Sequence, residues 1–353
     1  MTDESVTEVS DANVLVTNPI VTVMLTTYNQ QDYVAAAIEG VLGQNTDFPI
    51  ELIIGEDCST DRTRAVVLEY QQKYPEIIRV VLGATNVGAF NNSNRCFDRV
   101  RGEFVAYCEG DDYWHDAQKL EKQVDYLRAH PECGLVHSDY DLLVYNFGAW
   151  RRVKAESRPR RRKIEQGYIY DHLLRKMSVR TCTMMGRTEL LKKHYRSNLR
   201  TPVHAVGDRP IVLHMSKMAN IDYIDESLAT YRRTPGSMTN VGHVKLLAQI
   251  RRKIDMYENF FREFGSKEEE WMDMQRICFR ENLNAAFLAG NIREFSSTLD
   301  WLKNYDARYA NRFRVRLMAI LIHVPLVSNL LIKVKHYFNE VRLLRHSTVQ
   351  ESR

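Results

Sequence analysis

The stretch "EFVAYCEGDDYWHD", from Glu103 to Asp116, places three carboxylates within four residues, directly after an apolar run. They are Glu109, Asp111 and Asp112. Carboxylate oxygens bind Mg²⁺ or Mn²⁺, and such an ion can bridge the phosphates of a nucleotide while it keeps some of its waters. Without a cation, three charges this close would repel one another. The alternative is pairing with nearby basic side chains, for which the candidates are Lys119, Lys122 and Arg95.

Polar residues also follow three other apolar segments of strand character. These four segments are residues 19–25, 50–56, 77–82 and 103–108. The first three end in, or lead into, Thr26, Tyr28, Asn29, Glu56, Asp57, Asn86 and Gly88. Asp, Asn and Gly favour turns for backbone reasons alone, so any single cluster is equally well an ordinary turn. Four such clusters at the ends of four strands favour a binding site.

Helical patterns alternate with these strands and must position the clusters. Apolar residues recur at helical spacing within 34–42, and residues 59–61 offer N-cap side chains before a second helix. Near-continuous apolar strands separated by helices predict an α/β fold with a mostly parallel sheet covered on both faces. Open sheets of this kind bind ligands at the carboxyl ends of their strands, which is where the polar clusters fall.

Known phosphate-binding loops are missing from the sequence. No G-x-x-x-x-G-K-[ST] loop occurs, and no G-x-G-x-x-G follows a strand, so neither a Walker ATPase nor a dinucleotide enzyme is indicated. A metal ion held by carboxylates offers one other route to a bound nucleotide.

Composition narrows the class of protein. The 353 residues are 44% hydrophobic, enough for one large domain with an appendage. The net charge of +4, from 49 basic and 45 acidic residues, is too balanced for a histone-like nucleic-acid binder. Six scattered cysteines without a C-x-x-C pair, and an acidic N-terminus unlike a signal peptide, predict a cytoplasmic protein with reduced thiols.

Four segments together resemble a family 2 glycosyltransferase of the bacterial cell-envelope polysaccharide type. They are "VTVMLTTYNQQDYVAAAIEGVLGQ", "ELIIGEDCSTD", "NVGAFNNSNRCFDRVRGEFVAYCEGDDYWHDAQKLEKQVDYL" and "GDRPIVLHMSKMANIDYIDESLATYRRTPGSMTN". The likeness covers roughly residues 19–240 in the family's order. It implies the GT-A fold, in which a nucleotide-binding α/β half joins an acceptor-binding half, and a transfer that inverts the anomeric centre.

The resemblance assigns roles to the clusters. It places Thr26 and Tyr28 in the nucleotide pocket and makes Asp57 the carboxylate that reads the uracil or thymine edge. Glu56 stands where the family usually has the first Asp of a pair, and Asn94 would shape the floor of the sugar-phosphate site. We assign the remaining clustered residues to the same donor site, namely Asn29, Asn86, Gly88 and Asp112.

The "EGDD" stretch is similar to the family's Asp-x-Asp element. Asp111 is then the direct ligand of Mg²⁺ or Mn²⁺. Glu109 replaces the more usual first Asp, and its extra methylene permits a metal or water contact from slightly farther away. A UDP-linked or dTDP-linked sugar is the expected donor.

Asp208, in "AVGDRPIVLHM", is the candidate catalytic base. It follows a glycine and opens a predicted helix, so its pattern alone indicates a helix N-cap that contributes roughly 0.5 to 2 kcal/mol. An inverting transfer also needs a carboxylate that takes the proton of the attacking hydroxyl, and the resemblance places that base here.

Two arginines mark a departure from the family. After "ATYR" many relatives have a His that reaches towards the metal or diphosphate, whereas this chain has Arg233 and Thr234. Arg232 and Arg233 are expected to neutralise the leaving diphosphate, because guanidinium pairs well with phosphate oxygens. The alternative is an exposed strand edge.

The rest of the chain is divided by pattern. We expect a flexible tail (1–18), a nucleotide-sugar half (19–140), an acceptor half (141–240) and a helical C-terminal region (241–353). Residues 151–167 are dense in Arg and Lys. We expect them to form either a solvated loop or a contact for anionic lipid headgroups or a lipid-diphosphate acceptor. Within 312–346 an apolar run between basic flanks is too short to span a membrane, so we expect it to lie in the membrane interface or in a helical bundle.

These features predict an inverting glycosyltransferase that acts on a glycan or lipid-linked acceptor at the inner face of the cell membrane. One alternative is a non-catalytic nucleotide-sugar-binding protein. The presence of both Asp111 and Asp208 argues against it, because these are the expected metal ligand and catalytic base. The other is a metal-dependent nucleotidyltransferase, which usually needs a basic residue in a glycine-rich loop after its first strand. Here that turn is "TTYNQQ". No nucleic-acid partner is expected.

Overall fold

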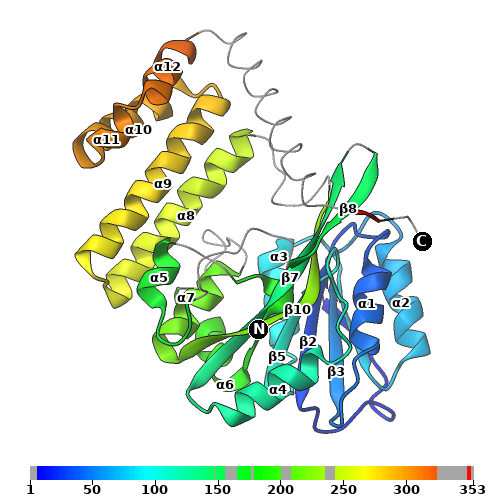
Figure 1. The fold of residues 1–353 in the computed structure, drawn as a ribbon. Coiled ribbons are helices and arrows are strands. Elements are labelled where there is room, and N and C mark those ends of the chain that lie inside the picture. Colours follow the sequence, from blue (N-terminus) through cyan, green and yellow to red (C-terminus); the bar gives the residue numbers. More distant parts are fainter. Residues whose placement is uncertain are drawn as a thin grey trace. The chain divides into compact units, whose positions relative to one another are not determined.

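The fold is known from a computed structural model, shown in Figure 1. It describes residues 6–146, 148–155, 165–175, 179–199, 208–234, 243–323 and 348–350. The chain forms two compact units. The first comprises residues 1–143, 154–169 and 178–232, and the second comprises residues 144–153, 170–177 and 233–353. The predicted borders at residues 18, 140 and 240 stay a prediction.

A mixed, largely parallel sheet is the centre of the first unit. Its strands lie in the order β1 (Val6–Val9), β4 (Ile78–Gly83), β3 (Ile50–Glu56), β2 (Val21–Thr27), β5 (Phe104–Glu109), β9 (Met185–Arg187), β7 (Cys133–Asn146), β10 (Asn220–Arg233) and β6 (Tyr113–Trp114). Strands β4, β3, β2 and β5 are parallel, whereas β1, β9 and β6 run antiparallel to their neighbours. The predicted α/β fold with a mostly parallel sheet is confirmed, because the four parallel strands are the four apolar segments found in the sequence.

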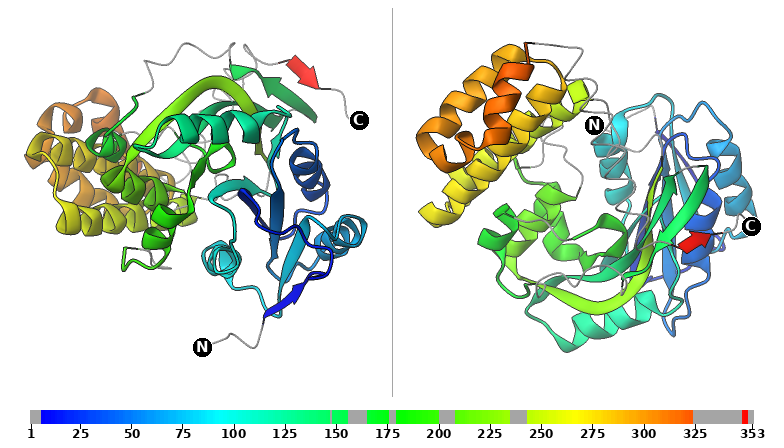
Figure 2. Two further views of the ribbon diagram at one scale, coloured as in Figure 1. Left: turned by 90° about the horizontal axis from the view of Figure 1, so that it is seen from below. Right: turned by 45° about the horizontal axis from the view of Figure 1, so that its top comes forward.

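Helices cover both faces of this sheet. They are α1 (Val34–Leu42), α2 (Thr63–Lys73), α3 (Gly88–Phe97), α4 (Lys119–Ala129), α6 (Thr188–Tyr195) and α7 (Arg209–Met218). The chain moves outward from β2 through β3 to β4 and then returns to β5 on the other side of β2. Because such crossovers are right-handed, α1 and α2 lie on one face and α3 on the other, as the left view of Figure 2 shows.

The carboxyl ends of β2 and β5 are therefore the point where the strand order reverses. Ligands of open α/β sheets bind at this point. The apolar residues beneath it are inaccessible to water, among them Val23 and Leu25 of β2 and Ile38 of α1. A rigid core thus lies directly under the predicted site.

The second unit is mainly helical. It contains α5 (Tyr170–Arg175), α8 (His243–Phe264), α9 (Glu268–Leu288), α10 (Ile292–Tyr305), α11 (Ala307–Ala310) and α12 (Phe313–Leu321), with β8 (Ala149–Val153) paired to β11 (Thr348–Gln350). The helical region predicted after residue 240 begins with α8, α9 and α10, which lie side by side in Figure 1. Their apolar faces share one core, to which Leu283, Phe295 and Leu302 contribute.

The structure describes only part of the two segments that we expected to contact a membrane. Of segment 312–346, residues 312–323 are described and the remainder lies outside the described residues, as do 156–164 of the basic run. Among the described helices, none is both long and apolar enough to cross a bilayer.

A lysine is fully buried at the start of α4. The Lys119 Nζ donates to Gln123 Oε1 at 2.6 Å and lies 4.1 Å from the centre of the Trp114 ring. Burial lowers the pKa of this ammonium to about 7. The charged form is disfavoured because little water reaches it and no carboxylate is among these contacts.

This burial makes stability depend on pH. The ordinary lysine pKa lies near 10.5, so between about pH 7 and that value the unfolded chain binds more protons than the folded chain. Stability therefore rises with pH in this window. We expect the free energy of unfolding of the wild type, relative to Lys119→Met, to rise by roughly 1 to 3 kcal/mol from pH 7 to pH 9. Denaturant titrations at both pH values measure this difference, with the exposed Lys303→Met as control, and a pH-independent difference would contradict it.

Candidate active site

The loops after β2 and β3 are fastened to each other by Asn29. Its backbone N–H donates to Ser59 Oγ at 3.0 Å, and its Oδ1 accepts from the Thr60 N–H at 2.8 Å. Asn29 adopts φ 51°, a left-handed conformation that Asn tolerates better than most residues. Tyr28, the residue before Asn29, remains 41% exposed at the edge of the sheet.

Glu56 and Asp57, at the end of β3, both serve as internal anchors. Glu56 is fully buried and pairs with the Arg64 Nε at 2.5 Å. Both Asp57 oxygens accept backbone N–H groups, from Val87 at 2.9 Å and Gly88 at 2.8 Å, at the start of α3. The structure thus gives each carboxylate a local partner, and their assignment to the donor stays a prediction.

The loop before α3 holds two more of the predicted residues. Gly88 begins α3 with φ 82°, and its N–H also donates to Asn86 Oδ1 at 3.1 Å. Asn94 lies in the last turn of α3 and is half-buried. The sequence did not single out Asn92, which is buried and donates from Nδ2 to the Gly55 carbonyl at 2.8 Å. Asn92 therefore connects α3 to the strand that ends in Glu56.

The last residue of β5, Glu109, and the tight turn that follows it, with Asp111 and Asp112, form what we call the acidic turn. The Gly110 N–H donates to the Thr26 carbonyl at 3.0 Å, which ties this turn to the end of β2. The Asp112 N–H donates back to the Glu109 carbonyl at 3.0 Å. This geometry brings Asp111 and its neighbours to the switch point between β2 and β5.

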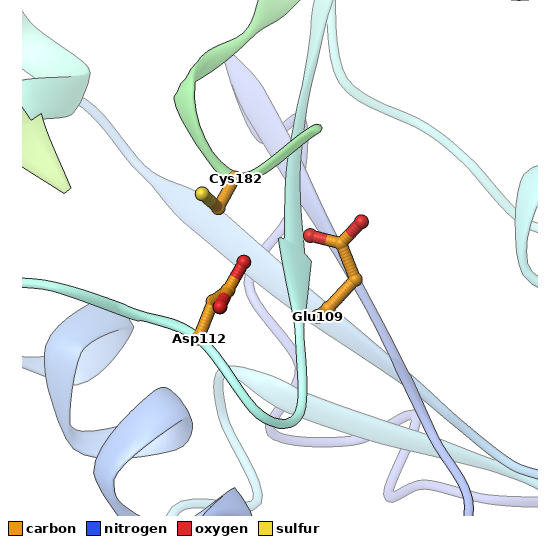
Figure 3. Close-up of side chains that lie close together, drawn as sticks. All are labelled: Glu109, Asp112 and Cys182. Carbon is orange, nitrogen blue, oxygen red and sulfur yellow. The ribbon is translucent and has the colours of Figure 1, made fainter. Parts of the chain in front are cut away.

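Glu109 and Asp112 face a third group that the sequence analysis missed. One carboxylate oxygen of each and the Cys182 Sγ all lie within 4.8 Å of one another, and Figure 3 shows the three side chains around a common space. Burial raises the pKa of Asp112 to about 8 and raises the pKa of Cys182 well above its usual value. The thiol therefore keeps its proton and can donate it to Asp112.

The two remaining acidic groups differ in their partners. Burial, with the nearby Asp112, raises the pKa of Glu109 well above the ordinary value. Its Oε2 is buried and has no hydrogen-bond partner among the described residues. Asp111 lies outside the group of Figure 3; burial raises its pKa, and the Gln30 side chain bonds to it. A bound cation would stabilise the ionised form of both carboxylates.

Asp208 lies at the N-cap position of α7 but does not cap it. Its carbonyl accepts from the Val212 N–H at 3.1 Å, whereas its side chain makes no capping hydrogen bond. The carboxylate instead lies beside the Thr181 side chain and the Arg180 charge, both of which lower its pKa. Burial raises the pKa of Asp208, and the Arg180 charge opposes that rise. The capping alternative considered from sequence is therefore not what the side chain does.

Three consecutive residues, Arg180 to Cys182, reach all of these buried acids. Arg180 faces Asp208, the Thr181 side chain lies beside both Asp208 and Glu109, and Cys182 lies beside Asp112. The segment carries no local motif. Its only signal in the sequence is a pair of polar residues, Arg180 and Thr181, a few positions before β9.

Arg180 is itself held by aromatic rings. Its Nε donates to the Tyr140 hydroxyl at 3.4 Å, and its guanidinium lies 5.1 Å from the centre of the Tyr231 ring. Such cation–aromatic contacts fix a guanidinium without neutralising it. The positive charge therefore stays available to Asp208.

Arg232 joins the site from the end of β10. Its backbone N–H donates to Asp112 Oδ1 at 2.7 Å, and its Nη1 donates to the Asp111 carbonyl at 3.2 Å. The guanidinium lies 4.5 Å from the centre of the Tyr113 ring. Arg233 is the exposed last residue of β10 and belongs to the second unit, so the structure does not place it in this site.

The lysines considered as partners for the acidic turn are engaged elsewhere. Lys119 donates to Gln123, and Lys122 pairs with Asp116 at 2.9 Å and Glu226 at 2.7 Å. Neutralisation by these two lysines is therefore wrong, and the arginine that reaches the turn is Arg232.

The chain is similar in sequence to known glycosyltransferases and to uncharacterized proteins. The family described as "Glycosyl transferase family 2" matches residues 22–195. The uncharacterized protein Rv1520 of Mycobacterium tuberculosis is 48% identical over 105 residues, which are 30% of this chain and 30% of that protein. The chain therefore matches less than a third of the length of these first relatives. The putative teichuronic acid biosynthesis glycosyltransferase TuaG of Bacillus subtilis is 29% identical over 225 residues, covering 63% of this chain and 82% of TuaG.

Solved structures share the fold at low identity. S. aureus TarS 1-349 in complex with UDP-GlcNAc gives a TM-score of 0.51 at 18% identity, covering 86% of this chain and 91% of that one. The mannosyltransferase PcManGT from Pyrobaculum calidifontis, in complex with GDP-Man and Mn²⁺, gives 0.55 at 14% identity, covering 89% and 87%. This likeness extends the GT-A-like fold over most of the chain. On the strength of this profile, residues 22–195 of the chain belong to glycosyltransferase family 2.

Proposed function

We propose that the protein is an inverting, metal-dependent glycosyltransferase that moves a sugar from a nucleoside diphosphate to a hydroxyl of a glycan or lipid-linked acceptor. The observation that carries the proposal is the position of Thr181, whose side chain interacts with the carboxylates of both Asp208 and Glu109 and lowers the pKa of each. This shared neighbour supports a single site that contains the candidate base and the acidic turn. Family membership and the likeness to TuaG support a role in cell-surface polysaccharide synthesis.

The donor would bind at the ends of β2, β3 and β5. Tyr28 is exposed there and offers a ring for a base to stack on, and Asp57 keeps unused lone pairs for the uracil or thymine edge. Arg232 would pair with the diphosphate. In the contacts described above its guanidinium lies over the Tyr113 ring and forms no ion pair with a carboxylate side chain, so its charge can bind phosphate oxygens. UDP-linked or dTDP-linked sugars remain the proposed donors, and the TarS structure with UDP-GlcNAc supports the first.

The acidic turn fits a divalent cation. Glu109 offers a buried oxygen without a protein partner among the described residues, and Asp111 offers a second carboxylate. Carboxylate oxygens suit Mg²⁺ and Mn²⁺, and a neighbour of this fold was solved with Mn²⁺. Asp111 would hold the ion, with Glu109 touching it directly or through water. The ion would supply positive charge to the leaving diphosphate.

Asp208 would perform the proton transfer. As the acceptor hydroxyl attacks the anomeric carbon, Asp208 takes the hydroxyl proton while the bond from that carbon to the diphosphate oxygen breaks. A base must be ionised to act, and Arg180 favours the ionised form against the effect of burial. Thr181 orients the carboxylate. We place this reaction at the inner face of the cell membrane, where a lipid-linked acceptor would be found.

Asp111→Asn tests the metal ligand. The amide removes the charge that holds the cation, so nucleotide affinity should fall chiefly when metal is present. Titration calorimetry with UDP, with and without Mn²⁺, measures this change. The exposed Asp125→Asn on α4 is the matched control. Equal affinity of wild type and variant for UDP at saturating Mn²⁺ would rule Asp111 out as the ligand.

Asp208→Asn tests the base. The amide keeps the size of the side chain and removes its basicity, so donor binding should survive while transfer falls by roughly 10² to 10⁴. Transfer rate and melting temperature are measured on one preparation. Unchanged transfer would assign the base to another residue, and donor binding without transfer in the wild type would favour the non-catalytic alternative.

Thr181→Val tests the link between base and acidic turn. Valine keeps the shape but lacks the hydroxyl, and hydrogen bonds to charged groups contribute about 1.5 to 3 kcal/mol. We therefore expect transfer to fall by roughly tenfold to a hundredfold with UDP affinity unchanged, and Thr181→Ser to restore most of it. A loss that Thr181→Ser shares would show that packing, rather than the hydroxyl, matters here.

A further inference from the structure

Helix α12 has apolar residues on two opposite faces. Val315, Met318 and Ile322 are buried in the core of the C-terminal helices. Three other apolar side chains fall on the other side of the helix, because helical residues advance by about 100° each. They are exposed to 81%, 38% and 66%, in the order Phe313, Leu317 and Ile320. The second face is thus an apolar stripe without a partner among the described residues.

Arginines border this stripe on both sides. The helical spacing places Arg314 along one edge and Arg312 and Arg316 along the other, and all three are exposed. Residues 307–323 contain four arginines and no Asp or Glu. Arg312 also contacts the Tyr309 ring, and Arg314 donates to Asn284 Oδ1 at 2.8 Å, so neither is neutralised by these contacts. We call the stripe and its three bordering arginines the α12 surface.

We propose that the α12 surface docks on an anionic lipid bilayer, with the helix lying in the plane of the interface. A helix with an apolar stripe and basic flanks binds such a surface by combining apolar burial with attraction to acidic headgroups. The sequence continues this composition beyond the helix, since residues 324–346 hold four Lys or Arg and one Glu among many apolar residues. The proposal does not depend on the transfer reaction.

A second copy of the chain fits this surface less well than a bilayer. In a two-fold contact the same patch meets itself, so the arginines of one copy would face those of the other. The α12 surface holds no carboxylate that would offset this repulsion. Charge complementarity therefore favours phosphate headgroups, which are negative and surround an apolar interior.

Vesicle sedimentation of the full-length protein tests the proposal. We expect binding to vesicles of equal parts phosphatidylcholine and phosphatidylglycerol, weak binding to phosphatidylcholine alone, and weakening of the first by salt. The variant R312Q/R314Q/R316Q should bind the anionic vesicles about tenfold less or weaker, since each basic residue near such a surface adds to the attraction. F313S/L317S/I320S should lose binding comparably.

Controls keep the test decisive. The variant V244S/I292S removes two exposed apolar residues elsewhere in the helical unit and should bind as the wild type does. Melting temperature checks the fold of each variant, and the single change Ile320→Ser, at an exposed site, serves if the triple variants are unstable. Wild-type protein that ignores anionic vesicles, or α12 variants that bind them unchanged, would overturn the proposal. A concentration-dependent dimer that only the α12 variants lose would assign the surface to a second copy instead.

Discussion

Burial of like charges in a small space is the constraint on which this site depends. Glu109, Asp112 and Asp208 all have pKa values raised by burial, and the partners described for them lie close by. Carboxylates removed from water tend to protonate unless cations or hydrogen-bond donors stabilise their charge. One segment, Arg180–Cys182, offsets the cost of burying these carboxylates. Its guanidinium, hydroxyl and thiol lie beside Asp208, Glu109 and Asp112 and lower their pKa values. A divalent cation would complete the compensation at the acidic turn.

The sheet explains how these groups come together. Strands β2 and β5 are parallel neighbours, so the residues after them emerge at the same edge. Strand β9 runs antiparallel beside β5, and it therefore brings the segment that precedes it to that edge. Strand β10 also ends near this edge. The backbone N–H of Arg232, one residue before the end of β10, donates a hydrogen bond to Asp112. The chemistry thus rests on pairing between segments that are far apart in the sequence.

This origin of the site explains what the sequence could and could not predict. The four parallel strands were predictable because apolar runs between helices are local patterns, and the acidic turn because its residues are contiguous. Asp208 was found through the family resemblance. Thr181 and Cys182 were missed, since only the pairing of β9 with β5 gives them their partners. The burial of Glu56 against Arg64 was missed for the same reason: a charged residue at a strand end looks exposed until its partner is placed.

In the proposed reaction the acidic turn holds the metal beside the diphosphate, and Asp208 acts on the opposite side of the anomeric carbon, because inversion requires attack opposite the leaving group. A crystal structure with a non-hydrolysable UDP-sugar analogue and Mn²⁺, with the metal located by its anomalous scattering, tests this claim most directly. We predict the metal between Asp111 and the diphosphate, and the Asp208 carboxylate on the side of the anomeric carbon away from the diphosphate. A metal bound to Asp208, or Asp208 on the same side as the diphosphate, would contradict the account.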